Sequence, residues 1–174
     1  GKKDMNKKTK YNLIGIVTAV LLVALDQWTK LLAVKHLMNQ KPFVIWDGVF
    51  ELHYLENRGA AFGILQGQKL IFLLCTVLVL VVLGFYYNRM PEDKKYLPLR
   101  VVGVLLGAGA VGNLIDRMAQ SYVVDFLYFK LIDFPIFNVA DCYVTAGAIL
   151  LAVLILFVYK DEELGFLSLK KKHE

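Results

Sequence analysis

Long runs of apolar residues dominate the pattern of this chain. Four of them, at about 11–34, 70–88, 99–116 and 139–159, have the length that a helix needs to cross a hydrocarbon layer of about 30 Å. The second run carries no charged residue, and the others carry only a few. We therefore predict an all-α integral membrane protein with four transmembrane helices.

These runs are joined by short segments, which favours a single membrane domain over residues 1–174. Residues 1–4 precede Met5 and are expected to be a cloning remnant. Small residues four positions apart on the third run predict close helix packing. They are Gly103 with Gly107 and Ala108 with Gly112.

Two segments lie on one predicted side of the membrane, at about 35–69 and 117–138. The first contains an Asp47-Gly48 turn, followed over residues 50–55 by β-favouring residues in partial apolar–polar alternation. Trp46 and its aromatic neighbours suit the membrane interface. The pattern predicts a small β-rich platform on this face.

Composition supports a membrane protein. Of the 174 residues, 57% are hydrophobic and 20% are charged, against roughly a quarter charged in a soluble domain. A chain of this size cannot hide so much apolar surface inside a water-facing core. Disorder is excluded too, because disordered chains combine low hydrophobicity with high net charge.

The distribution of Lys and Arg predicts the orientation, because basic segments stay on the cytoplasmic side. Basic residues concentrate in both tails and between the second and third helices, so both termini are predicted to be cytoplasmic. Topology then accounts for the net charge of +5, and no nucleic-acid partner is expected. The residues concerned are Lys7, Lys8, Lys10, Arg89, Lys94, Lys95, Arg100, Lys160 and Lys170–Lys172.

Acidic residues in or beside membrane helices are costly and point to function. At about 1.5 Å per residue, Asp26, Asp116 and Asp141 fall at one level, about 24–28 Å from the inner helix ends. Asp125 lies between the last two helices in an apolar and aromatic stretch, 122–129, and such surroundings raise a carboxyl pKa. Asp125 and Asp141 are therefore the candidates for chemistry.

For the other charged residues a structural role is the stronger interpretation. Asp26 and Lys30 are four residues apart, in the order that favours an ion pair on one helix face. Asp116 and Arg117 either cap the third helix or lock the loop that follows it. Asp141 also suits a capping position at the start of the fourth helix.

Residue types set several other chemistries aside. The serines are Ser121 and Ser168, so a serine–lysine protease would depend on Ser121 alone. Cys142 is interpreted as a small buried apolar residue rather than a nucleophile. The histidines lack zinc-ligand spacing, and no metal or other cofactor is expected, although a divalent ion on the aspartates is an alternative. What remains is a carboxylate pair that shares a proton, the chemistry of an aspartic protease.

Five short motifs, in this order, resemble the signature blocks of bacterial lipoprotein signal peptidase, the signal peptidase II family. They are Asp26-Gln-Trp-Thr-Lys30, Asn57-Arg-Gly-Ala-Ala-Phe62, Gly112-Asn-Leu-Ile-Asp-Arg117, Val123-Val-Asp-Phe126 and Phe137-Asn-Val-Ala-Asp141. The resemblance implies that Asp125 and Asp141 form the catalytic pair. The resemblance also implies that seven further residues line, brace or support the site: Asn57, Asn113, Asp116, Arg117, Asn138, Asp26 and Lys30.

The same resemblance implies a multi-pass endopeptidase of the bacterial plasma membrane with its active site toward the outer face. Its substrates would be prolipoproteins, cleaved just before a cysteine that carries diacylglyceryl, and membrane lipids would be its other partners. The alternative is a small transporter or channel with an acidic relay. The inner helix ends hold no matching acids, so access is one-sided and the peptidase is favoured.

Overall fold

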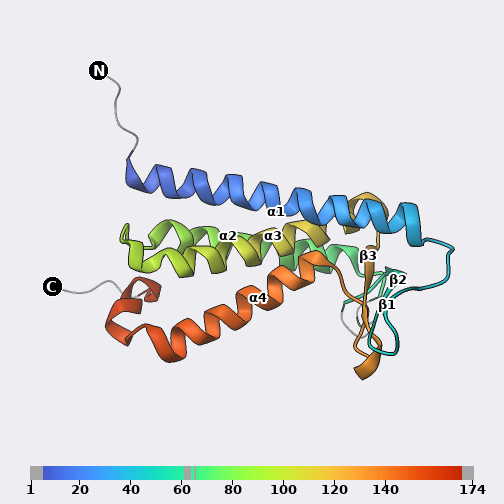
Figure 1. Ribbon diagram of the computed structural model, residues 1–174. Coiled ribbons are helices and arrows are strands. Elements are labelled where there is room, and N and C mark those ends of the chain that lie inside the picture. The colour runs from blue at the N-terminus through green and yellow to red at the C-terminus, as the bar shows by residue number, and fades with distance from the viewer. Residues whose placement is uncertain (1–5, 61–63, 65, 170–174) are drawn as a thin grey trace, which may run out of the picture.

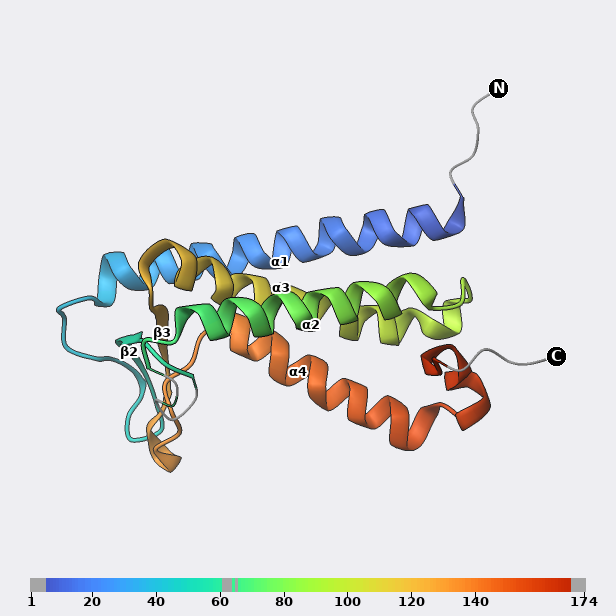
Figure 2. The same cartoon turned by 180° about the vertical axis from the view of Figure 1, so that it is seen from behind.

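Four long helices with a small sheet at one end make up the computed structural model (Figures 1 and 2), which describes residues 6–60, 64 and 66–169. All four are long and apolar enough to cross a membrane, which confirms the predicted helices. A π-helical turn at Leu154–Val158 prolongs the last one. Residues 1–4, Phe62 and Lys170–Lys172 lie outside the described residues. The helices are α1 (Lys7–Leu37), α2 (Lys69–Arg89), α3 (Leu97–Gln120) and α4 (Val139–Val153).

The central helix is α3, which packs against each of the other three. Small residues allow this: a Cβ on Gly109 would lie 2.6 Å from the carbonyl oxygen of Ala140 in α4. A Cβ on Gly112 would lie 2.5 Å from a carboxylate oxygen of Asp26 in α1. The expected close packing therefore holds at Gly112, whereas Gly107 faces open space.

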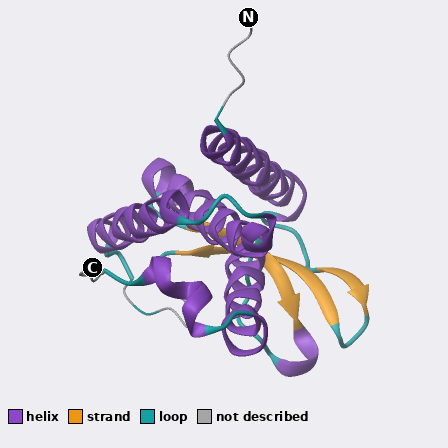
Figure 3. Ribbon diagram, turned by 90° about the vertical axis from the view of Figure 1, so that its left-hand side faces the viewer, coloured by secondary structure: helices purple, strands orange, loops and turns teal. Residues whose placement is uncertain are grey.

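The platform is a three-stranded antiparallel sheet in the order β1-β2-β3, which projects to the side of the helices (Figure 3). The predicted turn before β2 is confirmed, with Gly48 at φ +71°. The third strand was not predicted. Its first four residues are all buried, so the alternation that identifies a strand is missing. The strands are β1 (Phe43–Trp46), β2 (Phe50–Asn57) and β3 (Val123–Phe129).

An apolar core joins the sheet to α1. Ala33 of α1 and Val124 and Phe126 of β3 are buried in it, and Leu52 of β2 packs against them. This core fixes β3 beside the last turns of α1.

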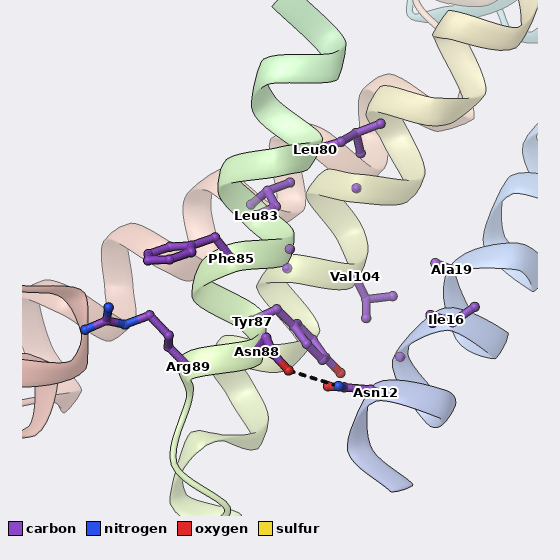
Figure 4. Close-up of a pocket in the computed structure, with 14 residues that line it drawn as sticks. Asn12, Ile16, Ala19, Leu80, Leu83, Phe85, Tyr87, Asn88, Arg89 and Val104 are labelled. Atoms are coloured by element: carbon purple, nitrogen blue, oxygen red, sulfur yellow. Dashed lines mark hydrogen bonds between the residues drawn. The ribbon is translucent and has the colours of Figure 1, made fainter. Parts of the chain in front are cut away.

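At the opposite end, α1, α2 and α3 border an apolar groove of about 590 Å³ (Figure 4). One end of the groove is polar, where the side-chain amide of Asn12 donates to Asn88 Oδ1 at 3.1 Å. Tyr87, from α2, also reaches α1 there through its hydroxyl, which donates to the carbonyl of Tyr11. These polar groups and the Tyr87 ring thus join α1 to α2 at this end of the groove.

Candidate active site

Asp125 is a buried carboxyl in β3, with 2% of its surface exposed. Its Oδ1 accepts a hydrogen bond from Asn138 Nδ2 at 2.7 Å, and its Oδ2 accepts one from Asn57 Nδ2 at 3.0 Å. Burial, followed by the negative charge of Asp141, raises the pKa of Asp125 to about 7, although the two amide donors oppose the rise. This carboxyl therefore holds a proton into the neutral range.

Asp141 belongs to a capping box at the start of α4. Asn138 Oδ1 accepts from the backbone N–H of Asp141 at 2.9 Å, and Asp141 Oδ2 accepts from the backbone N–H of Asn138 at 3.1 Å. The capping interpretation is thus correct. Because Asn138 is fully buried and also binds Asp125, one side chain connects both aspartates.

The Asp141 carboxylate is contacted by the side-chain amide of Asn113, which is bound in turn by the buried ammonium group of Lys30. Asn113 Nδ2 donates to Asp141 Oδ1 at 2.9 Å, and Asn113 Oδ1 accepts from Lys30 Nζ at 3.0 Å. Lys30 Nζ also lies 2.9 Å from Asp26 Oδ2 and 3.2 Å from Asp116 Oδ2. The predicted ion pair of Asp26 with Lys30 is confirmed, and so is the common level of the acids.

The two carboxylates around Lys30 tie separate elements together. Asp26 Oδ1 accepts the backbone N–H of Ala140 at 2.8 Å, which links α1 to α4. Asp116 Oδ2 accepts the backbone N–H of Val124 at 3.0 Å, which links α3 to β3. Asp116 therefore locks the following segment, as one interpretation held, and does not cap α3, which continues to Gln120.

Gln27 has a role in the site that the sequence pattern did not indicate. Its Nε2 donates to Asp26 Oδ2 at 3.2 Å, to Gly112 O at 3.1 Å and to Asp116 Oδ1 at 3.0 Å. Gln27 thus supplies a second donor to the carboxylates that Lys30 binds. Its place inside the motif that begins at Asp26 was the only available signal.

Asn57 and Arg117 brace the segment that follows β2. Asn57 Oδ1 accepts the backbone N–H of Gly59 at 3.0 Å, while Arg117 Nη2 donates to the carbonyl of Gly59 at 3.1 Å. The Arg117 guanidinium also stacks over the ring of Phe72 in α2, 4.0 Å from its centre. The arrangement orients the Asn57 amide that contacts Asp125.

Other candidate groups lie apart from this network. Cys142 is exposed, so its predicted burial is wrong: within the first turn of α4 it points away from the bundle, while its neighbour Asp141 points inward. Ser121 is exposed at the end of α3. Among residues 6–60, 64 and 66–169, no three His, Cys, Asp or Glu side chains form a group that could hold a metal ion.

Four helices of membrane-spanning length make this a multi-pass membrane protein, and a pair of aspartates braced by asparagine amides lies at one end of the helices. The sequence profile of a family described as Signal peptidase (SPase) II matches residues 18–157. The chain therefore belongs to the signal peptidase II family of proteases.

Similar proteins agree with this assignment. The chain is 46% identical over 145 residues to a lipoprotein signal peptidase of Caldanaerobacter subterraneus subsp. tengcongensis, a match that covers 83% of this chain and 97% of the relative. It is 43% identical over 150 residues to the lipoprotein signal peptidase of Streptococcus thermophilus, covering 86% and 95%.

Solved structures show the same fold. One bacterial membrane enzyme, determined at 2.3 Å by the in meso method, aligns with a TM-score of 0.70 and 33% identity over 92% of this chain and 93% of the other. A second, at 1.9 Å, aligns with a TM-score of 0.72 and 34% identity over 84% and 94%.

Proposed function

We propose that this protein is an aspartic endopeptidase that removes the signal peptide from diacylglyceryl-modified bacterial prolipoproteins, with cleavage just before the lipidated cysteine. The relatives named lipoprotein signal peptidase support this substrate class. The observation that carries the proposal is the position of Asn138, which is fully buried and donates to both carboxyls, from its side-chain amide to Asp125 and from its backbone N–H to Asp141. Asn138 thereby holds two carboxyls in one site.

The catalytic cycle requires one ionised and one protonated carboxyl. Asp125 is the more deeply buried of the two and has a pKa of about 7, so we assign the shared proton to it. Asp141 then takes a proton from a water molecule whose oxygen attacks the scissile carbonyl, while Asp125 protonates the carbonyl oxygen. Collapse of the tetrahedral intermediate breaks the C–N bond: Asp141 gives the proton it had accepted to the leaving amine, and a hydroxyl proton of the intermediate returns to Asp125, which restores the starting protonation of the pair.

The surrounding polar residues position this pair rather than react. Lys30 holds the Asn113 amide, and Asn113 in turn orients Asp141. Asn57 orients Asp125 in the same way from the other side. Such preorganisation lowers the reorganisation that the transition state would otherwise require.

We further propose that both termini are cytoplasmic and that the sheet and the aspartates face the outer side of the bacterial plasma membrane. The start of α1 and the segment that follows α4 lie at the end of the bundle opposite the sheet (Figure 1), where Arg89, Lys94 and Lys95 also lie. A substrate whose signal helix and acyl chains lie in the bilayer then reaches the pair sideways from the lipid.

Purified protein and a lipidated prolipoprotein test the proposed function. We expect a shift on a gel and, by mass spectrometry, a product that begins with the lipidated cysteine. Chelation should leave the rate unchanged, and the same precursor without its diacylglyceryl group should be cleaved much more slowly. Activity that is lost on chelation and restored by a divalent ion would instead assign metal-dependent hydrolysis, and equal rates for the two precursors would contradict the specificity for lipidated substrate.

A further inference from the structure

A second groove, of about 760 Å³, lies between the sheet and the last turns of α1. Its floor is apolar and includes Ala33 of α1, Leu52 of β2 and Phe126 of β3. Neighbouring residues on a strand point to opposite faces, so this groove lies on the face of β3 away from Asp125. It is therefore separate from the aspartate site.

Basic side chains lie around this apolar floor. Among the residues that the structure describes, Lys35, His36 and Lys41 line the groove and no acidic residue does. None of the ion pairs formed within the described part of the chain involves Lys35 or Lys41. A favourable interaction with the helix dipole accounts for Lys35 in the last turn of α1, but not for Lys41, which follows the end of the helix.

The groove also opens beside surface that faces the membrane. Leu31 and Leu32 of α1 are 68% and 38% exposed, and Phe43 at the start of β1 is 60% exposed. Because α1 is one of the four spanning helices, these side chains place the groove where lipid chains meet headgroups. A molecule that matches this groove would therefore combine apolar chains with a negative charge.

We propose that this groove binds one anionic phospholipid from the membrane leaflet beside the sheet. The acyl chains lie on the floor formed by Leu52 and Phe126, and Lys35 and Lys41 hold the phosphate. The diacylglyceryl group of the proposed substrate is the other candidate occupant. It carries no charge, so it would give Lys35 and Lys41 no anionic partner. This lipid site does not depend on the proposed peptidase chemistry.

Binding here connects two elements that support the aspartates. Phe126 follows Asp125 on β3, and Ala33 lies three residues beyond Lys30 on α1. A ligand that binds only the folded state raises its stability. Bound anionic lipid is therefore expected to raise the unfolding temperature of the protein.

Native mass spectrometry of the purified protein tests the site, with phosphatidylglycerol compared to phosphatidylcholine of identical acyl chains. We expect the wild type to retain one phosphatidylglycerol per chain and to release phosphatidylcholine readily. In the double variant Lys35→Gln/Lys41→Gln, the affinity for phosphatidylglycerol should fall about 30-fold, because each surface lysine contributes about fivefold.

The matched control is Lys7→Gln/Lys10→Gln, which removes the same charge from exposed positions at the other end of α1. It should retain the lipid like the wild type, and both doubles should unfold at the wild-type temperature when no phosphatidylglycerol is present. If both double variants lost phosphatidylglycerol equally, the lipid would be held by general electrostatic attraction, and the proposed site would be contradicted. Equal retention of phosphatidylcholine by the wild type, or wild-type retention of phosphatidylglycerol by Lys35→Gln/Lys41→Gln, would overturn it as well.

Discussion

The two aspartates can be distinguished from their neighbours by single substitutions. Asp125→Asn and Asp141→Asn keep the size and hydrogen-bonding shape of each side chain but remove its titratable proton. Turnover of lipidated precursor should fall by roughly three orders of magnitude or more in each variant, with folding retained. Single-turnover assays on protein that elutes as wild type in size-exclusion chromatography measure this.

Ser121→Ala and Cys142→Ala serve as controls for these variants. Both side chains are exposed and lie apart from the polar network, so each variant should keep most of the activity. Near-normal turnover by a folded Asp125→Asn protein would remove Asp125 from the catalytic pair. Loss of activity in Ser121→Ala would redirect attention to a serine nucleophile.

The protonation of Asp125 also predicts a pH profile. Its pKa of about 7 lies far above that of a solvated carboxyl, so the folded protein keeps a proton that the unfolded chain has already lost near pH 4. This contribution to stability is complete below about pH 4 and is lost as pH rises through about 7. Because only the protonated form can donate, kcat/KM should likewise fall as pH rises through about 7.

Asn57→Leu tests the assignment of that decline to Asp125. Asn57 donates to the Asp125 carboxylate and opposes the rise of its pKa, so the variant should shift the decline to higher pH. Arg58→Ala is the neighbouring control: Arg58 pairs with Glu56 at the surface and should leave the profile in place. A profile that stays unchanged in Asn57→Leu would assign the decline to another group.

Among the elements, α3 and α4 meet at a spacing that one glycine determines. A Cβ on Gly109 would lie 2.5 Å from Val144 Cγ2 and 2.6 Å from Ala140 O, and Ala140 immediately precedes Asp141. Gly109→Ala should therefore separate the helices and cost about 1–3 kcal/mol of unfolding free energy, with a loss of activity. Gly107→Ala, on the same helix but facing open space, should change the unfolding free energy by less than about 0.5 kcal/mol.

Reversible unfolding in detergent, followed by circular dichroism, compares these two variants. If Gly107→Ala destabilised the protein as much as Gly109→Ala, the cause would be helix backbone rather than helix packing. If Gly109→Ala left the unfolding free energy unchanged, α4 would be shown to shift without an energetic cost.

The elements also differ in how far the sequence determines them. Length and hydropathy identify the helices, because a segment in lipid must satisfy its own backbone hydrogen bonds. A fixed rise per residue then places Asp26, Asp116 and Asp141 at one level. The contacts of Lys30 with Asp26 and Asp116, and its link to Asp141 through Asn113, confirm this. The strand β3 has no such signature, because its first four residues are all buried and its partners, β2 and Phe137, are not its immediate neighbours in the sequence.

In the site too, features set by sequence neighbours could be predicted, whereas contacts between residues far apart in the sequence could not. The apolar neighbours of Asp125 indicate its raised pKa directly from sequence. By contrast, the partners of Gln27 are 85 and 89 residues away, at Gly112 and Asp116, and no local pattern encodes such contacts. Asn57 and Asn138 were expected only through the resemblance of their motifs, since an asparagine by itself suits any turn or cap.

For the molecule as a whole, the orientation in the membrane decides whether the aspartates can meet an exported substrate. The sheet and the α2–α3 turn lie at opposite ends of the bundle (Figure 1), so a label at each end reports on opposite sides. In a functional variant that lacks Cys75 and Cys142, a cysteine at Gln68 should react with an impermeant maleimide in intact cells. A cysteine at Lys94 should react only after the membrane is opened. Reaction at Lys94 but not at Gln68 in intact cells would invert the orientation and place the aspartates on the cytoplasmic side, where a precursor inserted with its lipidated cysteine outside could not reach them.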